Sequence, residues 1–355
     1  MEFGLYTFAD VKPDSAERKA MQTHQRITEL MEEIKVADEA GFDVFGVGEH
    51  HRPDYAISAP TTILAAASMI TKKIKLSSAV TVLSSEDPVR VFQQFATIDQ
   101  LSGGRAEIMV GRGSFIESFP MFGYDLNDYD ELFDEKLKML MQLNASETIT
   151  WKGKFTQTLN KARIYPRPYQ TTLPIWQAVG GTPASAINAA TLGLPLALAI
   201  IGGQPSQFVP FINLYRNTWN EMQTPDKTFQ LGINCHVYIA EDSQQASAEF
   251  FPSYAEVMSR IGKERGWQPM SLSQFENMRS PQGSLLVGSP MQVIEKILYI
   301  YELFGNTRFL AQMSLGNMQH KKILRSMELF ATEVVPAVKL AIGKTKKQNT
   351  SSTLK

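Results

Sequence analysis

Residues 74–110 read IKLSSAVTVLSSEDPVRVFQQFATIDQLSGGRAEIMV, and this stretch decides the fold. The apolar run over 74–83 predicts a buried strand, and the periodic segment 89–101 predicts an amphipathic helix. Ser102-Gly103-Gly104 is typical of a turn, and the apolar run 106–110 predicts a second strand. A strand, a helix and a strand in this order indicate a parallel pair, because parallel strands need a long crossover connection.

The same alternation continues along the chain in both directions. Further strands are predicted at 2–8, 44–47, 174–179, 196–201, 232–240 and 307–313. Further helices are predicted at 22–40, 60–71, 129–143, 184–192, 207–222, 243–263, 291–304 and 320–335. Eight strand-then-helix units without an early dinucleotide-binding fingerprint predict the α/β class and, within it, a closed (β/α)8 TIM barrel.

Three segments depart from this pattern. Residues 147–168 contain alternating apolar residues and two prolines, which predict a hairpin insertion. Residues 266–288 are rich in Pro, Ser and Gln, and predict a long loop near the barrel mouth. We therefore expect a single barrel domain over 1–340. The Lys-, Thr- and Ser-rich segment 341–355 predicts a disordered tail.

Composition excludes several classes of protein. The chain has 355 residues, and its 35 Lys and Arg nearly balance 36 Asp and Glu, for a net charge of −1. This balance indicates neither a nucleic-acid-binding nor a membrane-binding protein. The longest apolar stretch, 192–201, is too short to span a bilayer, and the N-terminus lacks the pattern of a secretory signal. The single cysteine, Cys235, permits no internal disulfide, so we expect a cytoplasmic protein with Cys235 buried in a strand.

The first candidate site follows the second predicted strand. In a β/α barrel the reaction face is formed by residues just after each strand, and here these are Gly48-Glu49-His50-His51-Arg52. A histidine can exchange a proton at neutral pH, so we predict that His50 or His51 is catalytic or contacts a ligand, and that Glu49 orients a histidine or hydrogen-bonds the substrate. Two other interpretations stay open: a structural, hydrogen-bonded histidine and a metal site. The metal site is disfavoured because neither HExxH nor a helical histidine pair is present.

The second candidate site follows the fourth predicted strand. Arg112 stands between Gly111 and Gly113. A guanidinium flanked by accessible backbone suits a phosphate or carboxylate, which it binds through paired hydrogen bonds. The alternative is a salt bridge between Arg112 and an acid on a neighbouring loop.

The third candidate site follows the fifth predicted strand, where Gly180-Gly181-Thr182-Pro183-Ala184-Ser185 leads into a helix. Glycines and hydroxyls at a helix start are typical of anion sites, because free N–H groups and the helix dipole point there. Ordinary capping by Thr182 is the alternative. An Arg, a glycine-hydroxyl helix start and a His on one rim together indicate a phosphorylated cofactor beside an acid/base group.

These segments resemble the bacterial luciferase family of flavin-dependent monooxygenases. The resemblance covers nearly the whole chain apart from the insertion, the 266–288 segment and the tail. It is carried by residues 40–51, by 59–113 with the motifs 71–76, 87–90 and 99–105, by 174–193 and by 333–336.

The resemblance implies a TIM barrel that binds FMN, usually as a homodimer, with reduced flavin supplied by a separate reductase. It implies that His50 is the catalytic histidine and that Arg112 binds the flavin phosphate. It also implies a phosphate loop and a non-prolyl cis peptide beneath the flavin ring. By position, these correspond to Gly180, Gly181, Thr182 and Ser185 and to Ala79-Val80, respectively. Some relatives with this fold bind the deazaflavin F420 instead.

Two departures from the light-emitting members argue against bioluminescence. Gly111 stands where those enzymes have a reactive cysteine, and Gly-Gly-Thr replaces their glutamate and serine in the phosphate loop. The function predicted is an FMN-dependent monooxygenase that oxidises a small organic substrate with O2. Alternatives are an F420-dependent dehydrogenase or reductase, a non-catalytic flavin-binding protein and a metal-dependent hydrolase. We expect four aromatic residues to line the substrate pocket: Phe8, Tyr55, Phe115 and Phe119.

Overall fold

A computed structural model describes residues 1–11, 16–222 and 227–352, and the chain in it forms two compact units. Unit 1 comprises residues 1–5, 40–42 and 179–355, and unit 2 comprises residues 6–39 and 43–178. The single domain expected over 1–340 stays a prediction.

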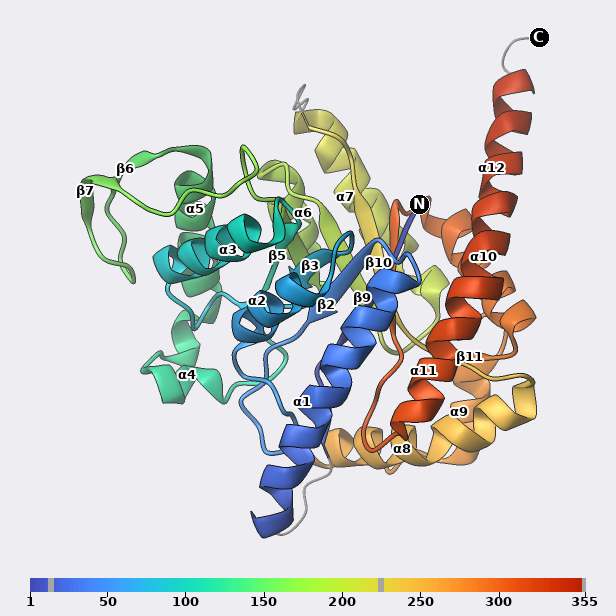
Figure 1. Ribbon diagram of the computed structural model, residues 1–355. Coiled ribbons are helices and arrows are strands. Elements are labelled where there is room, and N and C mark those ends of the chain that lie inside the picture. The colour runs from blue at the N-terminus through green and yellow to red at the C-terminus, as the bar shows by residue number, and fades with distance from the viewer. Residues whose placement is uncertain (12–15, 223–226, 353–355) are drawn as a thin grey trace. The chain divides into compact units, whose positions relative to one another are not determined.

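Unit 2 contains a parallel sheet in the order β2-β3-β5-β8, with β4 paired to β5. Figure 1 shows its helices beside this sheet. Its elements are α1 (Ala16–Glu39), β2 (Val44–Val47), α2 (Pro60–Ile70), β3 (Lys75–Ser78), β4 (Thr81–Val82), α3 (Pro88–Ser102), β5 (Ala106–Gly111), α4 (Ser118–Phe122), the 3-10 helix η1 (Leu126–Asp128), α5 (Tyr129–Ala145), β6 (Thr148–Trp151), β7 (Leu159–Arg163) and β8 (Ile175–Val179).

The motif at 99–105 holds the end of α3 and the start of β5. Gly103 ends α3 in the left-handed conformation with φ of 69°. The fully buried carboxyl group of Asp99 accepts hydrogen bonds from the Ala106 N–H at 3.1 Å and the Gln170 N–H at 2.8 Å. The Arg105 guanidinium donates to the carbonyls of Ser68, Thr71, Ile74 and Ser102. Residues 99–105, which carry part of the family resemblance, therefore have a structural role.

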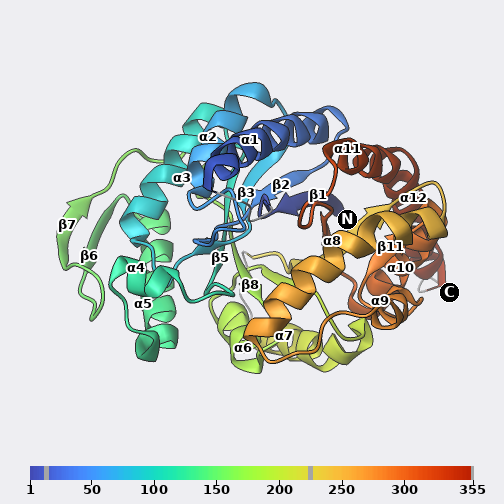
Figure 2. The same cartoon turned by 90° about the horizontal axis from the view of Figure 1, so that it is seen from below.

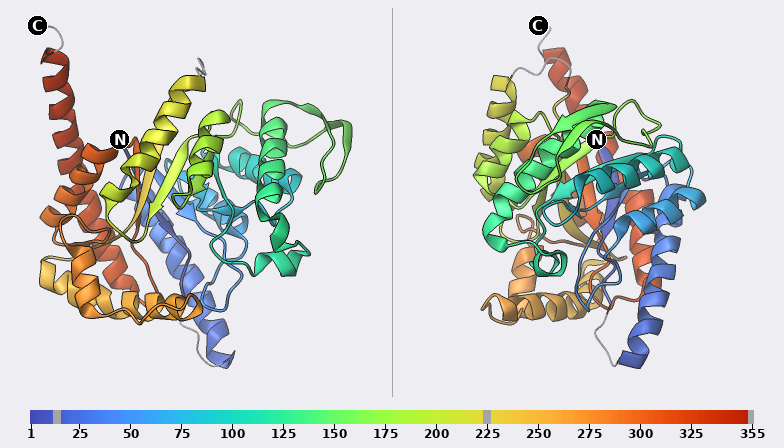
Figure 3. Two further views of the ribbon diagram at one scale, coloured as in Figure 1. Left: turned by 180° about the vertical axis from the view of Figure 1, so that it is seen from behind. Right: turned by 90° about the vertical axis from the view of Figure 1, so that its left-hand side faces the viewer.

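The insertion is confirmed as a hairpin. Strands β6 and β7 pair antiparallel and lie beside α5 in Figures 1 and 3. The Glu135 carboxyl group on α5 accepts hydrogen bonds from the backbone N–H groups of Lys154, Phe155 and Thr156 at 2.7–2.9 Å. One side chain thus fixes the turn of the hairpin to the helix before it.

Unit 1 contains the parallel strands β9, β10, β12 and β11, with β10 paired to each of the other three. Its elements are β1 (Glu2–Thr7, the last two residues of which belong to unit 2), α6 (Pro183–Thr191), β9 (Leu196–Ile200), the 3-10 helix η2 (Pro205–Phe208), α7 (Val209–Met222), β10 (Leu231–Ile239), α8 (Ser243–Glu264), α9 (Leu272–Arg279), β11 (Leu286–Gly288), α10 (Pro290–Phe304), β12 (Arg308–Gln312), α11 (His320–Leu329), the π-helix η3 (Phe330–Val334) and α12 (Val335–Ser352).

The long loop expected over 266–288 is corrected by the structure. Helix α9 and strand β11 lie within this segment, and Figure 2 shows both beside α8 and α10. Ser271 caps α9 with Gln274 in a capping box, and Phe275 packs fully buried against Phe250 and Tyr254 of α8. Despite its polar composition, this segment places Phe275, Leu285 and Val287 in one buried hydrophobic cluster with residues of α8.

The disordered tail expected over 341–355 stays a prediction. Helix α12 runs to Ser352, and residues 353–355 lie outside the described part of the chain. Val338 and Ile342 are buried on one face of this helix. These residues, four apart, anchor the first turns, and the polar residues that follow extend the same helix.

The strand order defines the fold class. Pairing runs β10-β12-β1-β2-β3-β5-β8-β9, and β9 pairs with β10. With helices between successive strands, this is the order of a TIM barrel, so the predicted fold class is confirmed. The strand expected over 74–83 is interrupted between β3 and β4, at residues 79 and 80. Within the described ranges, no helix combines the length and the apolar character needed to cross a membrane.

Candidate active site

The end of β2 carries the first group of candidate residues, all in unit 2. Gly48 follows β2, and a Cβ added there would lie 2.1 Å from the Phe8 ring and 2.9 Å from the Ala79 carbonyl oxygen. Only glycine therefore allows these groups to approach so closely. Beyond Gly48, the side chains of Glu49, His50 and His51 line one pocket.

Three aromatic rings surround His50. Its ring centroid lies 4.5 Å from that of Phe8, 4.3 Å from that of Tyr55 and 4.9 Å from that of Phe115. Among the described residues, neither nitrogen of the ring has a hydrogen-bond partner. Burial, with the nearby charges of Arg52 and His51, lowers the pKa of His50 to about 3. His50 is therefore neutral at physiological pH.

His51 has the opposite surroundings. Its Nε2 lies 2.9 Å from Oε1 of Glu49, and this hydrogen bond is the main cause that raises the pKa of His51. Glu49 is only 2% exposed, and its Oε2 accepts a hydrogen bond from the Val82 N–H at 3.0 Å. The structure thus brings the predicted Glu49 to His51 and to β4 rather than to His50.

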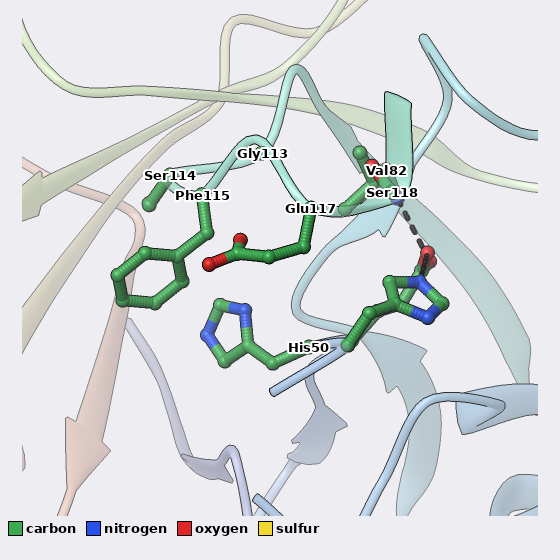
Figure 4. Close-up of a pocket in the computed structure, with 9 residues that line it drawn as sticks. His50, Val82, Gly113, Ser114, Phe115, Glu117 and Ser118 are labelled. Atoms are coloured by element: carbon green, nitrogen blue, oxygen red, sulfur yellow. Dashed lines mark hydrogen bonds and ion pairs between the residues drawn. The ribbon is translucent and has the colours of Figure 1, made fainter. Parts of the chain in front are cut away.

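Sequence reasoning missed a second charged pair at this pocket. Arg52 donates to Oε1 of Glu117 at 2.7 Å and lies over the Phe115 ring, 4.3 Å from its centroid. Figure 4 shows the Glu117 carboxyl group pointing toward the side on which His50 and Phe115 lie. Its Oε2 is buried and has no hydrogen-bond partner within the described residues. Glu117 follows β5 by only six residues, so its position in the loop after a strand is the sequence feature that marks it as a candidate.

The interruption between β3 and β4 is a cis peptide bond between Ala79 and Val80, neither of which is proline. This is the position that the family resemblance implied. A Cβ at Gly111 would lie 2.8 Å from Cγ2 of Val80, so a side chain there would collide with this segment. Glycine at position 111 therefore leaves room for the Val80 side chain.

Arg112 lies at the end of β5 and is paired with an acid. Its guanidinium is 3.1 Å from Oδ1 of Asp130 and 5.4 Å from the centroid of the Phe133 ring. This is the salt bridge that the sequence left open as an alternative. Asp130 is 75% exposed, however, and an ion pair with so exposed a partner is weak. The guanidinium can therefore exchange Asp130 for another anion.

The glycine-rich segment lies in unit 1 and leads into α6. Thr182 occupies the N-cap position, but its side chain makes no capping hydrogen bond. Gly181 has φ of 110°, which favours glycine, and no atom lies within 4 Å of a Cβ built on Gly180. Ser185 is buried, and its N–H donates to the Thr182 carbonyl. An uncapped helix start beside an open glycine fits a phosphate.

Other predicted residues lie elsewhere. Phe119 is fully buried and stacks on Tyr129 at 5.5 Å, so its predicted place in the substrate pocket is wrong. Cys235 is buried in β10 as expected, and burial raises the pKa of its thiol to about 12. Among the described residues, no three His, Cys, Asp or Glu side chains come together in a way that could hold a metal ion.

Stability is expected to fall as the pH drops from about 6.5 toward 4. Burial lowers the pKa of His50 to about 3 and that of His236 on β10 to about 4. Below the ordinary histidine pKa, the unfolded chain therefore binds protons that the folded chain does not. Stability from these groups is complete above about pH 6.5 and is lost below it, by about 1.4 kcal/mol per pH unit for each histidine. Urea unfolding at pH 7, 6 and 5 measures this slope.

Two variants test whether a buried histidine causes this pH dependence of stability. His236→Gln should flatten the slope, because the group that gains a proton on unfolding is gone. His24→Gln, which changes an exposed residue on α1, should leave the slope unchanged. Equal slopes in the wild type and in His236→Gln would contradict the prediction.

Comparison with known proteins identifies the family. The model of the luciferase-like monooxygenase family matches residues 1–307, and the chain belongs to this family. The predicted family and the predicted enzyme class, an oxidoreductase, are therefore confirmed. The crystal structure of monooxygenase RslO1 from Streptomyces bottropensis is similar with a TM-score of 0.82 and 26% identity, covering 95% of this chain and 99% of that one.

Two more distant structures share the fold. One is the oxygenating constituent of 3,6-diketocamphane monooxygenase from Pseudomonas putida in complex with FMN, with a TM-score of 0.75, 19% identity and coverage of 95% and 98%. The other is an F420-dependent secondary alcohol dehydrogenase in complex with an F420-acetone adduct, with a TM-score of 0.72, 19% identity and coverage of 95% and 98%.

Proposed function

We propose that this protein is an FMN-dependent monooxygenase that oxidises a small apolar organic substrate with O2. The observation that carries the proposal is the pocket in which His50, His51 and Glu49 lie together, close to the segment that contains the Ala79–Val80 cis peptide. Reduced FMN would supply the electrons that activate O2. The protein would bind the flavin, place the substrate and exclude water.

Each candidate contact to FMN has its own support. Arg112 offers a guanidinium whose present partner is exposed, and the 180–185 segment offers an uncapped helix start. The backbone at Ala79 and Val80 would lie against the flavin ring, with Gly111 leaving room for Val80. An apolar or aromatic substrate would be favoured, because aromatic rings lie around His50. These rings belong to Phe8, Tyr55 and Phe115.

An F420-dependent dehydrogenase or reductase is the second candidate, supported by the fold shared with the F420-acetone complex. Titration of the apoprotein with FMN and with F420, followed by fluorescence and absorbance, distinguishes the two cofactors. Preference for FMN together with O2-dependent turnover would support the monooxygenase. Preference for F420 would transfer the protein to the hydride-transfer class, and binding of neither would refute the cofactor assignment.

The remaining parts of the proposal come from the family resemblance. We propose a cytoplasmic homodimer that receives reduced FMN from a separate reductase. Light scattering after size-exclusion chromatography tests the dimer. Turnover with a purified flavin reductase, compared with turnover on chemically reduced FMN, tests the need for a reductase.

A further inference from the structure

The two adjacent histidines differ in what they can do with a proton. His50 is enclosed by rings, and its nitrogens have no polar partner among the described residues. His51 lines the same pocket, is fixed through Nε2 by Glu49, and meets Phe122 edge-on with centroids 5.2 Å apart. A buried acid that orients a histidine is the arrangement by which proteins prepare an imidazole to exchange protons.

The hydrogen bonds of Glu49 define which nitrogen of His51 is available. Oε2 of Glu49 accepts from the Val82 N–H, so Oε1 is held at a fixed place against Nε2 of His51. Nε2 must carry the hydrogen in this bond when Glu49 is ionised, because a carboxylate only accepts. Nδ1 is then the nitrogen that can gain or give a proton.

The charges around His51 favour its protonated form. Glu49, Glu86 and Glu117 all raise the pKa of His51, with the Glu49 hydrogen bond as the largest cause. Lys136 and Arg52 are the cations in the same surroundings: Lys136 acts on Glu86, and Arg52 is bound to Glu117. The raised pKa suits His51 to hold a proton at neutral pH, whereas the pKa of His50, lowered to about 3, does not suit it to this role.

We propose that His51, oriented by Glu49, delivers the proton that each turnover consumes, and that His50 forms part of the apolar wall of the pocket. The inference rests on the proposed function. Reduced flavin anion, O2, substrate and one proton give oxidised flavin, oxygenated substrate and water. The Nδ1–H bond of His51 breaks, and the proton goes to the oxygen atom that leaves as water. Solvent then returns a proton to Nδ1.

The first test needs no cofactor. NMR of the protein labelled in its five histidines, with each signal assigned by a His→Gln variant, follows the titration and tautomer of each ring. His51 should titrate above the ordinary histidine value, and His50 should stay neutral down to pH 5. Glu49→Gln should lower the pKa of His51 and move its hydrogen from Nε2 to Nδ1, because the amide NH2 would donate to Nε2. If Glu49→Gln changes neither the pKa nor the tautomer of His51, the inference is wrong.

The second test is kinetic and uses FMN alone. Reoxidation of protein-bound reduced FMN by O2 consumes one proton and yields oxidised FMN and H2O2. Its rate, measured by stopped flow between pH 5.5 and 9 with protein in excess, should fall as the pH rises through the pKa of His51. His51→Gln should slow the reaction about 100-fold at neutral pH and abolish this pH limb, in the range typical of a lost general acid. FMN affinity should change less than about threefold, well under 1 kcal/mol.

The matched variants decide between the two histidines. His50→Gln should keep the pH limb, and Glu49→Gln should move it to lower pH. If the limb disappears in His50→Gln and persists in His51→Gln, the inference is wrong although the proposed function stands. If neither FMN nor F420 binds the wild type, the proposed function fails and the role of His51 fails with it. The NMR titration would then still report the Glu49–His51 pair separately.

Discussion

Replacing Asp99 with alanine is expected to lower the free energy of unfolding by about 3–5 kcal/mol. Asp99 is 0% exposed, and its carboxyl group accepts from the N–H groups of Ala106 and Gln170 and from the Gln170 side chain. Alanine leaves the buried Ala106 N–H and the part-buried Gln170 N–H without these acceptors, at about 1–3 kcal/mol each, whereas the Gln170 side chain keeps the Ala106 carbonyl as a partner. A protein stable by about 5–15 kcal/mol loses a large part of its stability in this way. Urea unfolding monitored by circular dichroism gives the difference.

Two further variants test the cause. Asp99→Asn keeps one acceptor oxygen but turns an NH2 group toward a donor, so about half of the loss is expected. Glu39→Ala removes a carboxyl group that is 64% exposed, and should change the unfolding free energy by less than about 0.5 kcal/mol. If Asp99→Ala unfolds within about 1 kcal/mol of the wild type, the hydrogen bonds of Asp99 do not hold this part of unit 2 together.

Replacing Arg112 with alanine is expected to weaken FMN binding about 10- to 100-fold. A charge-assisted hydrogen bond from a guanidinium to phosphate contributes about 1.5–3 kcal/mol, which corresponds to this range. The side chain must leave Asp130, but that ion pair is with an exposed partner and costs little to break. Isothermal titration calorimetry with FMN measures the change in the dissociation constant.

Riboflavin, which lacks the phosphate, is the matched ligand for this prediction. Arg112→Ala should leave riboflavin affinity unchanged, because the lost contact is to the phosphate alone. Asp130→Asn should bind FMN as tightly as the wild type or up to about threefold tighter, because the competing negative charge is removed. Equal losses for FMN and riboflavin would indicate that Arg112 supports the fold through Asp130 and Phe133 instead of binding phosphate.

The comparison of FMN with riboflavin also tests the other candidate phosphate site, the helix start at 180–185. Thr182→Ala removes a hydroxyl that does not cap its helix, so it should change stability little. A loss of FMN affinity in Thr182→Ala, with riboflavin unaffected, would identify the helix start as a phosphate contact. The two sites can thus be tested independently, each by its own variant.

The sequence by itself was sufficient for the fold class and for the position of most elements. The periodicity of 89–101 and the apolar run 106–110 correspond to α3 and β5, and the eight strand-and-helix units correspond to a TIM barrel. Such patterns are legible because burial of one helix face or one strand repeats at short, regular spacing. Composition was misleading for residues 266–288, because a few buried apolar residues, Phe275 of α9 among them, are enough to pack a mostly polar segment.

The run Glu49-His50-His51 was located from the sequence, but the partners of its side chains were not. Consecutive residues after a strand point in different directions, and their partners come from distant segments: Val82 for Glu49, and Phe8 and Phe115 for His50. Two identical residues side by side consequently have pKa values shifted in opposite directions. The sequence determined which groups stand at the end of β2, whereas only the tertiary structure decided which of them is buried among rings and which is held by an acid, because burial and hydrogen bonding depend on segments far apart in the chain.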